Sequence, residues 1–184
     1  MLLWLVTGAL GADLKSGAYG ELRLGVDPVS HEISGAYFSA TGDDGKGNPQ
    51  FTCAFTLRAT AANGPVTVQS GPDRLTGTLA VDGDAVTLTL PENPPGCGNV
   101  QPFIEPVRLT LTAAQPWTAV RSIAADRAWF ADAPDTAPRK VYVVKGDVVV
   151  VFEAKGKSVR AAYTGATGRT TTGWIPVADL APLP

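Results

Sequence analysis

Residues 51–58 read Phe-Thr-Cys-Ala-Phe-Thr-Leu-Arg, and their alternation decides the fold class of the chain. Phe51, Cys53, Phe55 and Leu57 fall on one face of an extended segment, because successive side chains of a β-strand point to opposite sides. The other face carries Thr, Ala, Thr and Arg. One apolar and one polar face is typical of a strand in an antiparallel sheet that covers a core.

The same alternation recurs along the N-terminal half. Apolar residues alternate with other residues at Leu22, Leu24 and Val26, at Val66 and Val68, at Val86, Leu88 and Leu90, and at Leu109 and Leu111. Turn-forming pairs separate these segments, among them Asp27-Pro28, Asn63-Gly64, Gly71-Pro72 and Asp82-Gly83. Short strands at this spacing predict an all-β protein whose first domain, residues 13–115, is an antiparallel β-barrel or sandwich. Only residues 113–128 have a helix-compatible pattern.

Composition narrows the class of function. The chain has 184 residues, of which 45% are hydrophobic and 17% charged, as in folded proteins and unlike disordered ones. The formal net charge of −2 argues against a nucleic-acid partner, because bulk attraction to phosphate needs a basic chain. No uncharged apolar run reaches the roughly 20 residues of a membrane-spanning helix, so no membrane span is predicted.

The N-terminal residues 1–12, Met-Leu-Leu-Trp-Leu-Val-Thr-Gly-Ala-Leu-Gly-Ala, are uncharged and begin with an apolar run. Ala9-Leu10-Gly11 is a small-x-small triplet of the kind that signal peptidase cleaves. We interpret this segment as the remnant of a secretory signal whose basic leading region is missing. The alternatives are a core strand, a short helix or an artefact of the start codon.

Cys53 and Cys97 are the only cysteines, too few and too far apart for a zinc site with the usual paired spacing. Cys97 lies in residues 91–98, Pro-Glu-Asn-Pro-Pro-Gly-Cys-Gly, a stretch in which we expect no regular structure. A covalent link would support such a loop, so we predict a Cys53–Cys97 disulfide. Disulfides persist in oxidising compartments, which predicts a periplasmic or secreted protein. Two free buried cysteines in a cytosolic protein are the alternative.

A domain boundary is predicted near residues 113–117, where the charge of the chain changes sign. Residues 1–118 hold six Lys/Arg and eleven Asp/Glu, whereas residues 119–184 hold nine Lys/Arg and six Asp/Glu. The two halves therefore either attract each other weakly or present different faces to partners. Chance variation in composition is the alternative explanation.

The second domain, residues 119–184, also follows a strand pattern. Residues 139–153 predict two apolar strands that are joined at the turn Lys145-Gly146-Asp147. Val159–Tyr163 and Thr170–Ile175 predict further strands, and residues 176–180 predict a short helical turn. Five short strands in about 65 residues fit a small β-barrel.

Residues 120–182 resemble the bacterial SH3-like domain. The resemblance rests on Lys145-Gly146-Asp147 before the run Val148–Val151, and on the spacing of Gly156, Val159, Tyr163 and the triplet Gly173-Trp174-Ile175. It implies a small barrel that serves as a binding module in the bacterial envelope and docks a protein or a cell-wall glycan. Eukaryotic SH3 domains bind proline-rich helices in an aromatic groove. That groove has an aromatic residue where this chain has Asp179, which argues against a proline-rich helix as the ligand.

The candidate ligand-binding residues are aromatic side chains of this domain, namely Trp129, Tyr142, Tyr163 and Trp174. In the last long strand Ile175 is the natural core residue, so Trp174 on the opposite face is expected to point outward. Tyr142 and Tyr163 carry polar tips that suit a half-exposed surface. The alternative is that these rings pack the barrel or contact the first domain.

No catalytic, metal or cofactor site is predicted. His31 is the only histidine, and neither a Gly-x-Ser-x-Gly motif nor a phosphate-binding glycine loop occurs. Cys53 lies on an apolar strand face rather than beside an activating base. Residues 43–48, Asp-Asp-Gly-Lys-Gly-Asn, resemble part of a calcium loop but lack its closing Glu, so a hairpin turn is expected. We predict a protein that is not an enzyme; a small hydrolase built on two of the acids is a further hypothesis.

The N-terminal half has a faint likeness to the small β-barrels of the lysozyme-inhibitor type, with residues 51–55 as the stapled strand. This resemblance implies an alternative function, an inhibitor or immunity protein against a toxin or a cell-wall hydrolase. Such an inhibitor inserts a rigid loop into its target. The candidate inhibitory residues are those of the loop 91–98, in particular Pro94, Pro95, Gly96 and Gly98.

Overall fold

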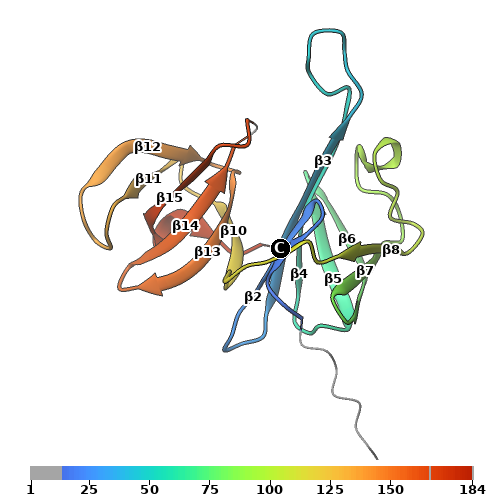
Figure 1. Ribbon diagram of the computed structural model, residues 1–184, viewed down its shortest axis with the longest axis horizontal. Coiled ribbons are helices and arrows are strands. Elements are labelled where there is room, and N and C mark those ends of the chain that lie inside the picture. The colour runs from blue at the N-terminus through green and yellow to red at the C-terminus, as the bar shows by residue number, and fades with distance from the viewer. Residues whose placement is uncertain (1–13, 166, 184) are drawn as a thin grey trace, which may run out of the picture.

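Nearly all regular structure in this chain is β-strand, in a computed structural model that describes residues 14–165 and 167–183. The strands form two curled antiparallel sheets, each shaped like a half-barrel, that lie side by side (Figure 1). The all-β fold class predicted from the sequence is therefore confirmed. The segment interpreted as a signal remnant, residues 1–12, lies outside the described residues.

The first sheet has nine strands, of which eight form a meander. Its strands are β1 (Gly17–Tyr19), β2 (Leu22–Val26), β3 (Ile33–Thr41), β4 (Phe51–Ala59), β5 (Gly64–Ser70), β6 (Asp73–Asp82), β7 (Ala85–Thr89), β8 (Val107–Thr110) and β9 (Ala113–Ala114), in the order β8-β7-β6-β5-β4-β3-β2-β1-β9. The chain that leaves β8 connects the two edges of this sheet. Leu111 donates a backbone hydrogen bond to Asp84, next to β7, and Thr112 donates one to Ala18 of β1. The sheet is therefore curled as in a barrel and does not stack on a second layer as in a sandwich.

The alternation in residues 51–58 builds the core of the first sheet. Cys53, Phe55 and Leu57 of β4 are buried. Tyr37 of β3 stacks on Phe55 with ring centroids 5.0 Å apart, and Phe103 meets both rings edge-on. Aromatic pairs in such arrangements contribute about 0.5–1.5 kcal/mol beyond the area that they bury. Because Phe103 belongs to the loop between β7 and β8, this loop is anchored in the core.

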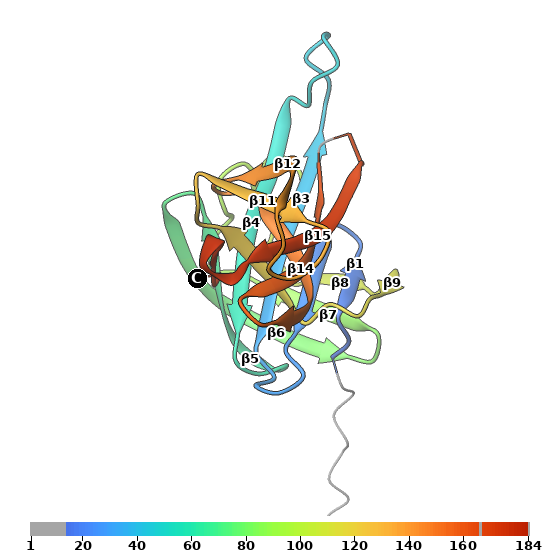
Figure 2. The same ribbon diagram turned by 90° about the vertical axis from the view of Figure 1, so that its left-hand side faces the viewer.

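The hairpin of β3 and β4 extends beyond the rest of the sheet (Figures 1 and 2). The outermost pair of β2 with β3 is Leu22 with Tyr37, whereas β3 and β4 continue to pair as far as Thr41 with Phe51. The projecting part is thus a two-stranded ribbon, which explains why Phe38 is 59% exposed. Its tip, residues 43–48, is a turn in which the carboxylates of Asp43 and Asp44 accept backbone N–H groups.

The second sheet contains seven strands. They are β10 (Ala119–Ile123), β11 (Arg127–Ala131), β12 (Pro138–Val144), β13 (Val148–Lys155), β14 (Ser158–Thr164), β15 (Thr170–Pro176) and β16 (Leu180–Ala181), in the order β12-β11-β15-β14-β13-β10-β16. The short helical turn expected at residues 176–180 is the 3₁₀ helix η2 (Val177–Asp179). The helix-compatible pattern of residues 113–128 was misleading. This stretch forms β9, β10 and the start of β11, because burial of Ile123 and Ala128 in a sheet core outweighs weak helical propensity.

Strand β10 connects the two sheets. The backbone N–H of Val120 donates to the hydroxyl of Ser34 in β3, and Arg121 lies 3.7 Å from a carboxylate oxygen of Glu32. An apolar cluster surrounds this contact and contains Val120, Val150, Ala162 and Leu183, with Ala36, Trp117, Val148 and Phe152 packed against it. The first sheet thus contributes Ala36 to a core that belongs mainly to the second, and the two sheets share a packed interface.

Candidate functional site

A cleft of about 340 Å³ opens on the second sheet. We call it the tryptophan cleft, and it is lined by Trp129, Ala131, Asp135, Thr136, Pro138, Lys157, Ser158, Trp174, Pro176 and Asp179. These residues come from β11, β12, β14, β15, η2 and the turns between strands. The cleft therefore combines two large aromatic rings and two prolines with charged groups of both signs.

The register of β11 and β15 places the two tryptophans on one face of the sheet. Ala131 pairs with Trp174, and Trp129 lies two residues before Ala131 on the same strand. Residues that are paired or two apart point to the same side of a sheet. Ile175, the next residue after Trp174, is fully buried, whereas Trp174 is only partly buried. Trp174 therefore points away from the core, as the alternation of the last long strand predicts.

The two tyrosines of the predicted groove lie in different places. Tyr142 packs against Trp129 with ring centroids 4.7 Å apart, and it is 43% exposed, so it flanks the tryptophan cleft. Tyr163 does not line the cleft. Its ring packs against the core of the second sheet, and its hydroxyl donates to Asp147 at 3.3 Å. Burial and the nearby charge of Asp147 raise the pKa of Tyr163.

Asp135 presents a carboxylate that is fixed in position at the cleft. The hydroxyl of Ser158 donates to Asp135 Oδ1 at 3.0 Å, and the backbone N–H of Asp135 donates to the same hydroxyl oxygen at 3.3 Å. Asp135 has a φ of 55°, in the left-handed region that costs an ordinary residue about 1 kcal/mol or more. A Cβ at Gly156 would lie 2.7 Å from Asp135 Oδ2, so the absence of a side chain there makes room for the carboxylate.

Asp179 contributes a second carboxylate to the cleft. Burial raises the pKa of this carboxyl, and among the described residues no Lys or Arg lies within ion-pair distance of it. Lys157 also lines the cleft. With two carboxylates against one ammonium group, the cleft is weakly negative above the pKa of Asp179 and suits a cationic group.

The sequence analysis missed most of the polar residues of this cleft. Asp135, Thr136, Lys157 and Ser158 lie in or beside turns, where no alternation marks the side chains that face a site. The sequence marks Asp179 only as a departure from the aromatic groove of SH3 domains. The turn sequence Ala133-Pro134-Asp135-Thr136 was the available signal, since Pro-Asp pairs mark turns whose side chains project.

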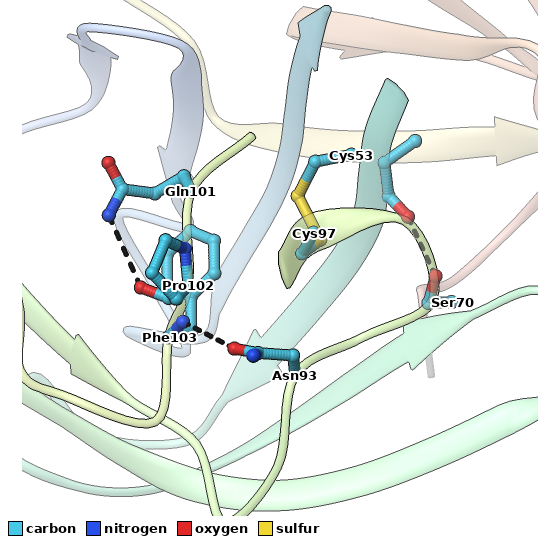
Figure 3. Close-up of a disulfide and its surroundings, with 8 residues drawn as sticks. Cys53, Ser70, Asn93, Cys97, Gln101, Pro102 and Phe103 are labelled. Carbon is cyan, nitrogen blue, oxygen red and sulfur yellow. Dashed lines mark hydrogen bonds between the residues drawn. A yellow bond between two sulfur atoms is a disulfide. The ribbon is translucent and has the colours of Figure 1, made fainter. Parts of the chain in front are cut away.

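The predicted disulfide is present between Cys53 of β4 and Cys97 (Figure 3). The loop 91–98 is more ordered than expected. It leads into the 3₁₀ helix η1 (Cys97–Asn99), and Asn93 Oδ1 accepts the backbone N–H of Phe103 at 2.8 Å. Of the four candidate inhibitory residues, Pro94 is buried, and the exposed ones are Pro95, Gly96 and Gly98.

The other candidates for chemistry lie apart from this cleft. His31 is exposed in the turn between β2 and β3, with a φ of 59°. In the described ranges no three side chains of the His, Cys, Asp and Glu types gather as metal ligands. Within the same ranges, no helix has the length and apolarity needed to span a membrane.

No family model, curated protein or solved structure matches this chain.

Proposed function

We propose that this protein is a non-enzymatic binding protein of the bacterial envelope that docks a segment of a partner protein in the tryptophan cleft. Trp129 and Trp174 carry the proposal, because they lie on the outer face of one sheet and line the same cleft. Rigid aromatic residues in a cleft are typical anchors of binding sites. The SH3-like resemblance of this domain supports the same role.

The charges of the cleft indicate the chemistry of the ligand. Asp135 and Asp179 line the same cleft as the two tryptophan rings, so a basic side chain next to an apolar one would find carboxylates and aromatic faces in one cleft. Such a cation gains about 0.5–2 kcal/mol from an aromatic face alone. A glycan could also stack on the rings and donate its hydroxyl groups to the carboxylates, but an uncharged sugar would leave the net negative charge of the cleft unbalanced. We therefore favour a basic protein segment over a cell-wall glycan.

The disulfide supports an extracytoplasmic location for this function. Both of its cysteines are fully buried and they join β4 to a loop, as in proteins that fold under oxidising conditions. Together with the apolar N-terminal segment, it makes the periplasm or the cell exterior the proposed location.

The test compares the affinity of the parent protein and of Trp174→Ala for two kinds of ligand. One is a set of peptides that place Lys or Arg beside Pro, Leu or Trp, and the other is soluble cell-wall glycan fragments. Binding is followed by tryptophan fluorescence. We expect the variant to lose about 2 kcal/mol of peptide affinity, as for a central interface aromatic. Phe38→Ala is the matched control, because Phe38 is an exposed aromatic of the other sheet.

A large fall in the melting temperature of Trp174→Ala with unchanged peptide affinity would contradict the proposal. Equal losses of affinity in Trp174→Ala and Phe38→Ala would contradict it as well. Saturable binding of the glycan fragments, with no binding of the peptides, would show that the cleft binds a glycan and would contradict the proposed basic protein segment.

A second candidate function, an inhibitor or immunity protein, is favoured by the rigidity of the loop 91–98. The disulfide holds this loop against β4, and a Cβ at Gly96 would clash with the carbonyl oxygen of Thr52. Preorganised loops are the elements by which inhibitors bind tightly. In this case Pro95→Ala would reduce inhibition of a cell-wall hydrolase and Trp174→Ala would not.

A further inference from the structure

A second cleft, of about 400 Å³, lies on the other side of the start of β12. Pro138 lines the tryptophan cleft, whereas the next residue, Arg139, lines this one. We call it the arginine cleft, and its lining consists of Arg139, Val141, Arg169, Thr170, Thr171 and Thr172. Two guanidinium groups and three threonines line it, and no Asp or Glu does.

The guanidinium of Arg139 is held in place by its surroundings. Its Nη2 donates to the carbonyl oxygen of Thr172 at 2.8 Å, and its Nε lies 3.4 Å from a carboxylate oxygen of Asp132. The group also stands over the ring of Phe130, 5.9 Å from its centre. Only one N–H of Nη2 is engaged in a hydrogen bond, while Nε is buried without a hydrogen-bond partner among the described residues, so the N–H groups of Nη1 and the second N–H of Nη2 remain for a ligand.

The absence of a side chain at Gly173 leaves room both for this guanidinium and for the backbone carbonyl oxygen of Ala131, which would lie 2.8 Å from a Cβ there. A Cβ on Gly173 would lie 2.5 Å from Arg139 Nη2, closer than non-bonded atoms approach. The backbone of Gly173 is not in the left-handed region, so conformational freedom does not explain this glycine. The glycine in β15 therefore makes space for the guanidinium group of Arg139.

Arg169 brings a second positive charge to the same cleft. It ends the turn that begins at Gly165, whose backbone N–H donates to the carbonyl oxygen of Arg169 at 3.0 Å. In the described part of the chain Arg169 has no carboxylate within ion-pair distance. The carboxylate of Asp132, which partly balances Arg139, is largely exposed, and such a pair contributes little. The charge of the cleft is therefore positive and incompletely balanced.

From this geometry we propose that the arginine cleft binds an oxyanion group, a carboxylate or a phosphate, of a ligand. Guanidinium groups present paired N–H donors that match the oxygens of both anions. The hydroxyl groups of Thr171 and Thr172 add donors without charge, whereas that of Thr170 is paired with Thr164 at 2.9 Å. A bound oxyanion would offset the repulsion between the two arginines. This site is independent of the tryptophan cleft, since the two share no lining residue.

The test is a titration of the isotope-labelled protein with sodium phosphate, and separately with sodium acetate, at constant ionic strength set by chloride. Backbone amide signals are followed by NMR. We expect saturable shifts at Thr170, Thr171 and Thr172 with at least one of the two anions, and the tighter anion identifies the source of the oxyanion. Arg169→Gln is expected to weaken this binding by about tenfold or more, as the loss of a charge-assisted hydrogen bond does.

Lys140→Gln is the matched control, because Lys140 is the exposed neighbour of Arg139 on β12 and does not line the cleft. It removes the same charge and should leave the affinity unchanged. Arg139→Lys keeps the charge but removes the paired N–H donors of the guanidinium. It should weaken anion binding while the backbone amide signals of residues outside the cleft stay unchanged. The proposal is overturned if neither anion gives saturable shifts at these threonines, or if Lys140→Gln weakens binding as much as Arg169→Gln.

Discussion

The backbone N–H of Val120, in the first strand of the second sheet, donates a buried hydrogen bond of 2.8 Å to the hydroxyl of Ser34 in the first sheet. The two residues are 86 positions apart in the sequence. Within its own sheet, β10 pairs with β13 and β16. A backbone donor that points out of its sheet thus finds its acceptor in the neighbouring sheet, which fixes how the two pack.

Ser34→Ala is expected to destabilise the protein by about 1–3 kcal/mol, because it leaves a buried N–H without an acceptor. Urea unfolding measures the difference in the free energy of unfolding. Ser30→Ala, in the exposed turn before β3, is the control and should cost about 0.5 kcal/mol or less. Equal stability of Ser34→Ala and the parent protein would show that the hydrogen bond does not hold the interface.

Removal of the disulfide in a Cys53→Ala, Cys97→Ala double variant is expected to cost about 4 kcal/mol, given the separation of 44 residues and the entropy of closing such a loop. Denaturant unfolding with and without reductant measures the effect. Reductant should shift the unfolding midpoint of the parent protein and leave that of the variant unchanged. A parent midpoint that does not respond to complete reduction would contradict this account.

Asp179→Asn is expected to make the protein more stable at neutral pH and to weaken binding of a basic segment in the tryptophan cleft. Burial raises the pKa of Asp179 above its usual value of 3.8, so the folded state binds this proton more tightly than the unfolded state does. The stability contributed by this carboxyl therefore decreases as the pH rises from the unfolded-state pKa to the folded-state pKa. The advantage of Asp179→Asn should disappear on acidification below both pKa values.

The difference is measured by unfolding both proteins at a series of pH values from acid to neutral. Asp126→Asn is the control, because Asp126 is an exposed acid in the bend between β10 and β11. A lower stability of Asp179→Asn at neutral pH would show that the carboxylate makes a stabilising contact.

Gly96→Ala is expected to destabilise the protein by about 2 kcal/mol or more, through the left-handed backbone, with φ 80°, and the clash with Thr52. Gly98→Ala is the matched control in the same loop, since a Cβ there would meet only Asn93, at an ordinary 3.5 Å. Thermal unfolding compares the two variants. Similar melting temperatures would mean that the loop moves away from β4 at little cost.

Much of the fold could be predicted from local patterns. Residues 51–58 fall in β4 with Cys53, Phe55 and Leu57 buried, and residues 139–153 form most of β12 and β13 around the turn at 145–147. The alternation of Thr172–Ile175 also predicts the outward direction of Trp174. These features can be predicted because successive side chains of a strand alternate between its two faces, so the pattern depends only on residues that are close in the sequence.

The sequence by itself determined most of the strands outside residues 113–128 and the apolar face of those that alternate, and it favoured a disulfide between the two cysteines. Only the tertiary structure decided which strands lie side by side. The pairing of Ala131 with Trp174 brings Trp129 into the tryptophan cleft, whereas Tyr163 is directed to the core. The contact of Arg139 with Thr172 is likewise a product of the fold. The physical reason is that every strand has the same period of two, so alternation sets the face of a side chain but cannot select its neighbours, which depend on contacts between distant segments.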